Sequence, residues 1–188
     1  ETNFLKSMDK ICVLDFGGQY AHLISRRIRE LGVYVEIYYP DEVSLDKLKQ
    51  FKGIILSGGP QSVYEENSPK VDPLIFELQI PVFGICYGHQ LMAYLLKGDV
   101  KPGITKEYGF ANINFDKESV LFSKFDNNQV WMSHGDSVKI VPNNFKITAS
   151  TSDCEVTAME NSDKNFFGVQ FHPEVVHTKS GMKLFEKF

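Results

Sequence analysis

The feature that most constrains the fold is an alternation of short apolar runs with helical patterns over the first half of the chain. The expected strands are residues 11–15, 33–38, 53–56 and 81–85, and the expected helices are residues 21–31, 44–50, 72–78 and 87–96. Apolar strands separated by helices indicate a parallel sheet covered on both faces. Because such crossovers are nearly always right-handed, we expect an α/β fold with an open, doubly wound, mainly parallel sheet of the flavodoxin-like kind.

The second half of the chain has a different pattern. Short strand-like runs separated by polar turns cover residues 110–115, 130–133, 137–140, 146–150, 155–160 and 166–170. They predict antiparallel additions to the sheet, closed by a helix over residues 179–188. Since no repeat or linker interrupts the pattern, we interpret residues 1–188 as a single domain, with residues 1–7 an extension before a start at Met8.

Charge and cysteine usage exclude several classes of function. The formal net charge is −4 and no long basic run is present, which argues against nucleic acid or an anionic membrane as a partner. No apolar stretch is long enough to span a bilayer. The three cysteines, Cys12, Cys86 and Cys154, form no C-x-x-C pair, so we expect no metal site and no disulfide framework. This usage favours a reducing, cytoplasmic location.

Cys86 is the cysteine whose surroundings indicate chemistry. Gly84-Ile85-Cys86-Tyr87-Gly88 has the G-x-nucleophile-x-G form of a nucleophile elbow, with an apolar strand before it and a helix after it. The glycines suit a tight strand-to-helix turn that leaves no room for flanking side chains. A cysteine at the start of a helix also benefits from the helix dipole, which favours an anion. Without a base, however, this motif is equally compatible with a buried structural cysteine.

A base for this nucleophile is expected at His172. His172-Pro173-Glu174 directly follows an expected strand, so it falls at the carboxyl edge of the sheet, where Cys86 also lies. The Glu174 carboxylate can turn back and orient the imidazole. His89 is too close to Cys86 along the helix to form a line of attack, although it can pack nearby. The sequence therefore predicts a Cys86–His172–Glu174 triad.

Acyl transfer also requires donors for an oxyanion. Ser57-Gly58-Gly59-Pro60 ends an expected strand, and its glycine amides can approach a ligand closely. We assign the amides of Gly59 and Tyr87 as the oxyanion hole. Gln90 lies one helical turn after Cys86, so its side chain can border the same pocket.

Together these motifs resemble those of the class I (triad-type) glutamine amidotransferases, over almost the whole chain. Asp15-Phe16-Gly17-Gly18-Gln19-Tyr20, Ser133-His134-Gly135-Asp136 and residues 171–178 are similar, more narrowly, to the amidotransferase part of the GMP synthetases. Sister enzymes, including anthranilate synthase, carbamoyl-phosphate synthetase and CTP synthase, share the triad elements. Residues 15–20 and 175–178 are what favour the GMP synthetases.

The resemblance implies that L-glutamine is hydrolysed to glutamate and ammonia through a thioester at Cys86. His172 would act as general base and then acid, and Glu174 would orient it. The residues that the resemblance implies for holding the α-amino and α-carboxylate groups of glutamine are Gly58, Gln90, Gly135 and Asp136. His134 has an alternative interpretation as a structural residue of that loop.

The resemblance also implies a partner. Ammonia would pass to an ATP-pyrophosphatase domain or subunit, which uses ATP and Mg²⁺ to activate xanthosine monophosphate (XMP) and aminate it to GMP; no cofactor is expected in the present chain. Whether this chain is an excised domain or a separate subunit stays open. We hypothesise that residues 15–20 and 175–178 form the partner interface, with Gln19, Tyr20 and His177 as candidate contacts.

Other functions stay open at this point. The chain could serve another synthetase, or act as a stand-alone γ-glutamyl hydrolase of the same fold. It could also be a flavodoxin-like binding module in which Gly17-Gly18 cradles a phosphate, although the G-x-G-x-x-G spacing is absent.

Overall fold

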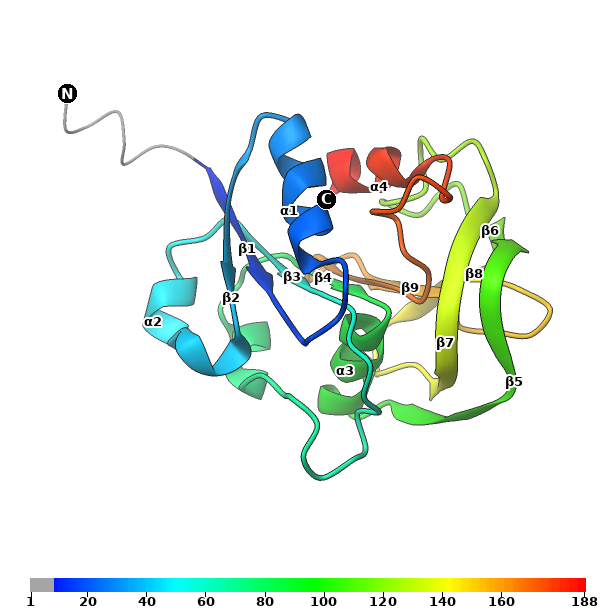
Figure 1. Ribbon diagram of the computed structural model, residues 1–188, viewed down its shortest axis with the longest axis horizontal. Coiled ribbons are helices and arrows are strands. Elements are labelled where there is room, and N and C mark those ends of the chain that lie inside the picture. Colours follow the sequence, from blue (N-terminus) through cyan, green and yellow to red (C-terminus); the bar gives the residue numbers. More distant parts are fainter. Residues whose placement is uncertain (1–8) are drawn as a thin grey trace.

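The computed structural model describes residues 9–188, so the expected extension over residues 1–7 lies outside the described part. In chain order the elements are β1 (Lys10–Leu14), α1 (Ala21–Glu30), β2 (Tyr34–Tyr38), η2 (Pro40–Glu42), α2 (Leu45–Leu48), β3 (Gly53–Leu56), η3 (Pro73–Glu77), β4 (Val82–Ile85), α3 (Tyr87–Leu95), β5 (Asp99–Asn112), β6 (Asn114–Phe115), β7 (Gln129–Ile140), β8 (Lys146–Ser150), β9 (Ala158–Asn161), β10 (Phe166–Val169) and α4 (Gly181–Lys187). Figure 1 shows how they are arranged. Within residues 9–188, no helix combines the length and apolar character needed to cross a membrane.

The central sheet has eight strands in the order β2-β1-β3-β4-β10-β9-β8-β6. The strands from β2 to β10 run parallel, whereas β9, β8 and β6 are added antiparallel. This confirms the predicted mainly parallel sheet with antiparallel additions. It also brings β10, from near the end of the chain, beside β4, so that segments far apart in sequence reach the same edge.

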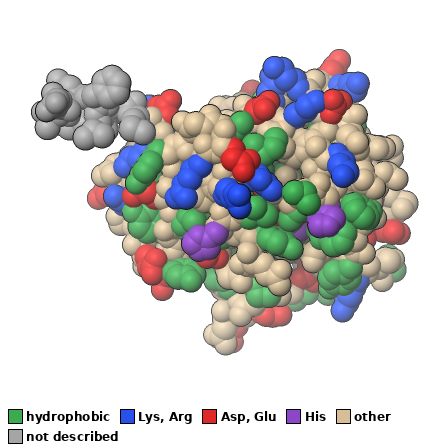
Figure 2. Space-filling view, turned by 45° about the horizontal axis from the view of Figure 1, so that its top comes forward, with side chains coloured by type: hydrophobic (Ala, Val, Ile, Leu, Met, Phe, Trp, Pro, Cys, Tyr) green, Lys and Arg blue, Asp and Glu red, His purple; other side chains and the backbone are tan. Residues whose placement is uncertain are grey.

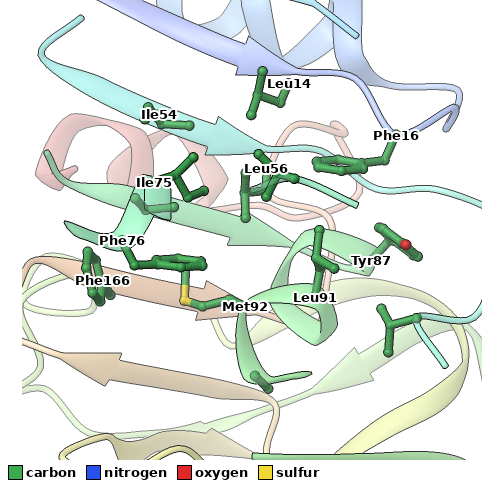
Figure 3. Close-up of a cluster of buried hydrophobic side chains, with 14 of the residues drawn as sticks. Leu14, Phe16, Ile54, Leu56, Ile75, Phe76, Tyr87, Leu91, Met92 and Phe166 are labelled. Carbon is green, nitrogen blue, oxygen red and sulfur yellow. The ribbon is translucent and has the colours of Figure 1, made fainter. Parts of the chain in front are cut away.

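Helices cover both faces of this sheet, as expected of a doubly wound fold (Figure 1). Side chains alternate along each strand, so Leu14 and Leu56 face one core while Val13 and Ile55 face the other. The first core lies against η3 and α3, and Figure 3 shows Ile75, Leu91 and other members of it. The second core lies against α1 and α4.

Local sequence signals account for several boundaries. Ser44 caps α2 by accepting a hydrogen bond from the Lys47 amide at 3.1 Å. Asp72 accepts one from the Leu74 amide at 3.0 Å at the start of η3. The weakly helical pattern over residues 72–78 therefore corresponds to a 3₁₀ helix. Gly32, with φ of 81°, adopts the left-handed conformation just after α1.

The expected arrangement was wrong for β5 and β7, which pair only with each other in a separate two-stranded sheet. We expected separate strands at residues 130–133 and 137–140, but β7 runs through both. Its partner β5 starts well before the strand expected at residues 110–115, and a register shift between Pro102 and Glu107 absorbs extra residues. The polar segment between the two apolar runs of β7 resembles a turn locally, and pairing with β5 keeps it extended.

Candidate active site

The elbow at Cys86 has the backbone that its sequence predicts. Cys86 joins β4 to α3 with φ of 53° and ψ of −107°, a conformation that non-glycine residues rarely adopt. A Cβ atom at Gly88 would lie 2.2 Å from the Leu56 carbonyl oxygen, and one at Gly84 would lie 2.5 Å from the Gly88 carbonyl oxygen. Both glycines are therefore required for α3 to begin this close to β3 and β4.

The fold brings His172 to this elbow. Because β10 pairs with β4 in parallel, the segments after both strands leave the same edge of the sheet. The Cys86 amide donates to the Val169 carbonyl at 2.9 Å, which joins the elbow to the end of β10. The His172 amide donates to the Trp131 carbonyl at 3.0 Å, and the Thr178 hydroxyl donates to the His172 carbonyl at 2.6 Å. Backbone contacts on both sides thus fix the position of the imidazole.

His172 and Glu174 form a closely coupled pair. His172 Nδ1 lies 2.6 Å from Glu174 Oε1, and both side chains are buried. Burial alone would lower the pKa of His172, but the negative charge of Glu174 and the neighbouring Cys86 raise it above its ordinary value. With Nδ1 engaged by the carboxylate, the other ring nitrogen is left for the thiol side. The geometry suits a thiol–imidazole–carboxylate relay.

Sequence reasoning missed two groups that touch the thiol. Gln170 Nε2 lies 3.7 Å from Cys86 Sγ, and the Cys86 thiol lies 3.5 Å from the Ser133 carbonyl oxygen. Gln170 is fully buried, and its own Oε1 accepts a hydrogen bond from Gln90 at 3.1 Å. A signal was available in the sequence: Gln170 ends the strand expected over residues 166–170 and stands two residues before His172, and alternate residues of a strand share a face.

A pocket of about 370 Å³ opens beside the thiol. Its lining includes Gly17, Gly18, Gln19, Tyr20, Gly58, Gly59, Pro60, Cys86, Trp131, Ser133 and His172. The amides of Gly59 and Tyr87 donate no hydrogen bond to any residue within 9–188. Two backbone donors beside the thiol are what a developing oxyanion requires.

The other residues predicted to hold substrate are arranged differently. Gly58 lines the pocket, whereas Gln90, Gly135 and Asp136 are not among its lining residues. The Asp136 carboxylate accepts hydrogen bonds from the hydroxyls of Ser62 and Tyr64, and its backbone carbonyl accepts one from Gln90 at 3.0 Å. Gln90 also donates to Gln170, which contacts the Cys86 sulfur. The role of Gln90, Gly135 and Asp136 in binding substrate stays a prediction.

His134 and the side chains around it are explained by contacts within the protein. His134 Nδ1 lies 2.7 Å from the Asp136 carbonyl and its Nε2 lies 2.9 Å from Glu107 Oε1, which fits the alternative structural interpretation of this histidine. Together with Cys154 these side chains form the one described group whose potential ligand atoms lie within 4.8 Å of one another. Hydrogen bonds within the protein already engage the histidine and the carboxylate. Burial raises the pKa of the Cys154 thiol, which opposes the thiolate that a metal needs.

The candidate partner residues gather around the pocket mouth. Gln19 is exposed, and the Tyr20 ring packs edge-on against the His172 ring with centroids 5.4 Å apart. The exposed His177 packs on Trp131 at 4.4 Å between ring centroids. Trp131, Gln19 and Tyr20 all line the pocket. The two segments expected to form the partner interface, residues 15–20 and 175–178, therefore lie beside the same pocket.

Comparison with known proteins agrees with this geometry. The family model for glutamine amidotransferase class-I matches residues 12–188. The chain is 51% identical over 185 residues to a GMP synthase [glutamine-hydrolyzing] of Brachyspira hyodysenteriae, and 50% identical over 188 residues to that of Lactobacillus acidophilus. These alignments cover 97% and 98% of the chain but 36% of each relative, so the chain spans about a third of their length.

Solved structures share this fold. A candidate GMP synthase subunit from Thermoplasma acidophilum superimposes with a TM-score of 0.85 at 30% identity, covering 96% of this chain and 92% of that one. A glutamine amidotransferase from Thermotoga maritima shares the fold, with a TM-score of 0.72 at 23% identity over 89% of this chain and 76% of that one. The chain therefore belongs to the class-I glutamine amidotransferase family.

Proposed function

We propose that the chain hydrolyses L-glutamine to glutamate and ammonia, with Cys86 as nucleophile. The observation that carries this proposal is the juxtaposition of a strained cysteine elbow with a buried His172–Glu174 pair at one pocket. A histidine held by a carboxylate can take the thiol proton, because the carboxylate stabilises the imidazolium that results.

The proposed reaction has two halves. Cys86 Sγ attacks the side-chain amide carbon of glutamine, and the oxygen charge that develops is met by the amides of Gly59 and Tyr87. His172 gives its proton to the leaving nitrogen, and the carbon–nitrogen bond breaks. Ammonia departs, and a γ-glutamyl thioester remains on Cys86. Water then attacks the thioester with His172 as base, which releases glutamate and restores the thiol. Glu174 keeps the imidazole oriented throughout.

We further propose that the ammonia serves GMP synthesis. The support is the name of relatives about half identical to this chain, together with the fact that the chain spans 36% of their length. The acceptor would be an ATP-pyrophosphatase domain or subunit that uses ATP and Mg²⁺ to aminate XMP. The three free cysteines, all buried, suit a reducing cytoplasm for this activity.

A phosphate-cradling role for the Gly17-Gly18 turn has less support. The Gly18 amide already donates to the Gly58 carbonyl at 3.2 Å, so this donor is not available to a ligand. The turn is better explained as part of the pocket wall.

The partner is proposed to dock over the pocket mouth, on Gln19, Tyr20 and His177. Figure 2 shows one face of the protein, on which acidic and basic side chains are intermixed. The three candidate contacts include no lysine or arginine, and such contacts suit a protein partner better than a polyanion. Alanine at Gln19 and His177 should reduce the stimulation of glutaminase by the synthetase part. If the synthetase part stimulated the glutaminase activity of these variants as much as that of the unaltered chain, the proposed interface would be wrong.

The activity test compares the unaltered chain with Cys86→Ala, and uses Cys154→Ser as a control for loss of another buried thiol. Glutamate release should vanish in Cys86→Ala and persist in Cys154→Ser. With an ATP-pyrophosphatase partner, ATP, Mg²⁺ and XMP, GMP should form from glutamine only when Cys86 is present, whereas added ammonium should support either variant. Glutamine hydrolysis without any GMP would indicate another acceptor, and partner-independent cleavage of γ-glutamyl peptides would indicate a hydrolase.

A further inference from the structure

Ser57 lies where three elements of the active site meet. Its amide donates to the Leu14 carbonyl at the end of β1 at 3.1 Å, and its carbonyl accepts from the Gly88 amide in α3 at 3.1 Å. Figure 3 shows the neighbouring side chains Phe16, Leu56 and Tyr87 gathered at this junction. Ser57 is 1% exposed, so its hydroxyl must find its partners inside the protein.

The hydroxyl uses both of its hydrogen-bonding capacities on backbone groups. Ser57 Oγ accepts from the Phe16 amide at 3.0 Å and donates to the Gly58 carbonyl at 3.0 Å. A hydroxyl has one proton to donate, so the bond to Phe16 leaves that proton for Gly58. The Gly58 carbonyl also accepts from the Gly18 amide at 3.2 Å. Two donors therefore hold one carbonyl.

This carbonyl determines where the Gly59 amide points. In a trans peptide the C=O and the N–H point in opposite directions, so holding the Gly58 oxygen toward Ser57 and Gly18 turns the Gly59 N–H away from them. A Cβ atom at Gly58 would lie 3.2 Å from His172 Cε1 and 3.6 Å from Cys86 Cβ, so the peptide borders the catalytic pair. The Gly59 N–H has no acceptor within the described part of the chain and is available there.

We propose that Ser57 is a positioning residue: its hydroxyl, together with the Gly18 amide, holds the Gly58–Gly59 peptide so that the Gly59 N–H faces the oxyanion of the reaction. This inference rests on the glutaminase activity proposed above. It adds that the Ser57 hydroxyl orients the Gly59 N–H, which is one of the two oxyanion donors. It also explains the Gly17-Gly18 turn, because a Cβ atom at Gly18 would lie 2.6 Å from the Gly58 oxygen and displace the peptide.

The proposal separates two reactions of the same thiol. Acylation by an amide creates a tetrahedral oxyanion that needs the Gly59 N–H, whereas alkylation by iodoacetamide is a direct displacement that creates none. Loss of an oxyanion donor in other enzymes lowers turnover by roughly 10²- to 10³-fold. Ser57→Ala leaves the donor present but less firmly held, so we expect acylation to fall by about 10- to 100-fold.

The test measures single-turnover release of p-nitroaniline from L-glutamate γ-(p-nitroanilide), with enzyme in excess, beside iodoacetamide alkylation of Cys86. Ser119→Ala is the matched control, because Ser119 is also fully buried, accepts from the Phe122 amide at 3.4 Å and donates to Glu160 at 2.8 Å, away from the pocket. Gly18→Ala is a second variant that displaces the same peptide from outside the core.

In Ser57→Ala, acylation at saturating substrate should fall while the alkylation rate and the half-saturating substrate concentration change little. In Gly18→Ala, whose altered residue lines the pocket, acylation should fall more than alkylation. Ser119→Ala should acylate like the unaltered chain. Acylation by Ser57→Ala within twofold of the unaltered chain would overturn the inference, and so would an equal loss of acylation and alkylation. If the unaltered chain itself failed to acylate yet was alkylated at Cys86, the proposed function would fail instead.

Discussion

His89 offers a test of how tightly α3 is packed behind the active site. It follows Cys86 by one turn and is completely buried, with its ring against Gly168 of β10. Its Nε2 lies 3.3 Å from the Val156 carbonyl, and its Nδ1 has no partner within residues 9–188. Burial lowers the pKa of His89 from 6.5 to about 3, and the hydrogen bond to Val156 only partly opposes this. The folded protein therefore holds this histidine neutral.

The magnitude follows from proton linkage. Between pH 6.5 and about 3 the unfolded chain binds a proton at His89 that the folded chain does not, so stability falls as the pH is lowered through this window. Each pH unit inside the window is worth roughly 1.4 kcal/mol. Lowering the pH from 7 to 5 should therefore remove about 2 kcal/mol of the free energy of unfolding through this one group.

The perturbation is His89→Gln, which keeps an N–H for the Val156 carbonyl and removes the titrating ring. Urea unfolding at pH 7 and at pH 5 would give the free energy of unfolding of each protein. The loss between the two pH values should be about 2 kcal/mol smaller in His89→Gln than in the unaltered chain. Other titrating groups contribute equally to both proteins and cancel.

His22→Gln is the control for exchanging a histidine for glutamine, because His22 is exposed on α1 rather than buried. An equal loss of stability in the unaltered chain and in His89→Gln would refute the reasoning, since His89 would then take up its proton without penalty in the folded protein.

Three further outcomes are expected. Glu174→Gln removes the charge that stabilises the imidazolium, so glutamine turnover should fall on the order of 10³- to 10⁴-fold with little change in KM, and a loss below tenfold would contradict the assigned role. Gly88→Ala places a Cβ atom 2.2 Å from a β3 carbonyl, and should lower the free energy of unfolding in urea by roughly 2–3 kcal/mol; an unchanged midpoint would show that the elbow is looser than described. Gln170→Met removes an N–H donor from the thiol sulfur, so iodoacetamide alkylation of Cys86 at pH 7 should slow by about tenfold, and an unchanged rate would exclude that donor.

The first half of the fold could be predicted because its signals are local. β3 has the bounds that its apolar run predicts, and the Ser44 cap and Gly32 stop act within a few residues of the helices they limit. The pairing of β5 with β7 could not be predicted in the same way. It depends on contacts across the chain, and the polar segment from Ser133 to Asp136 looks like a turn until its partner strand is known.

The same distinction between local signals and contacts of distant segments applies to the candidate site. Cys86, His172 and Glu174 stand in motifs whose residues are close in sequence, and the fold brings these motifs together. Gln170 and the Ser57 hydroxyl, in contrast, contact groups that other segments contribute. Gln170 contacts the Cys86 sulfur, and the Ser57 hydroxyl accepts from the Phe16 amide. A pattern along one chain does not reveal such contacts. It shows only that these residue types can donate or accept hydrogen bonds.

Labelling with the electrophilic glutamine analogue 6-diazo-5-oxo-L-norleucine, followed by peptide mapping, tests the central claim most directly. We predict a single modified residue, Cys86, which excess glutamine protects, because the analogue and the substrate must share the pocket beside His172. Modification at another residue, or modification of Cys86 that glutamine does not slow, would contradict the claim that this thiol opens the amide of glutamine.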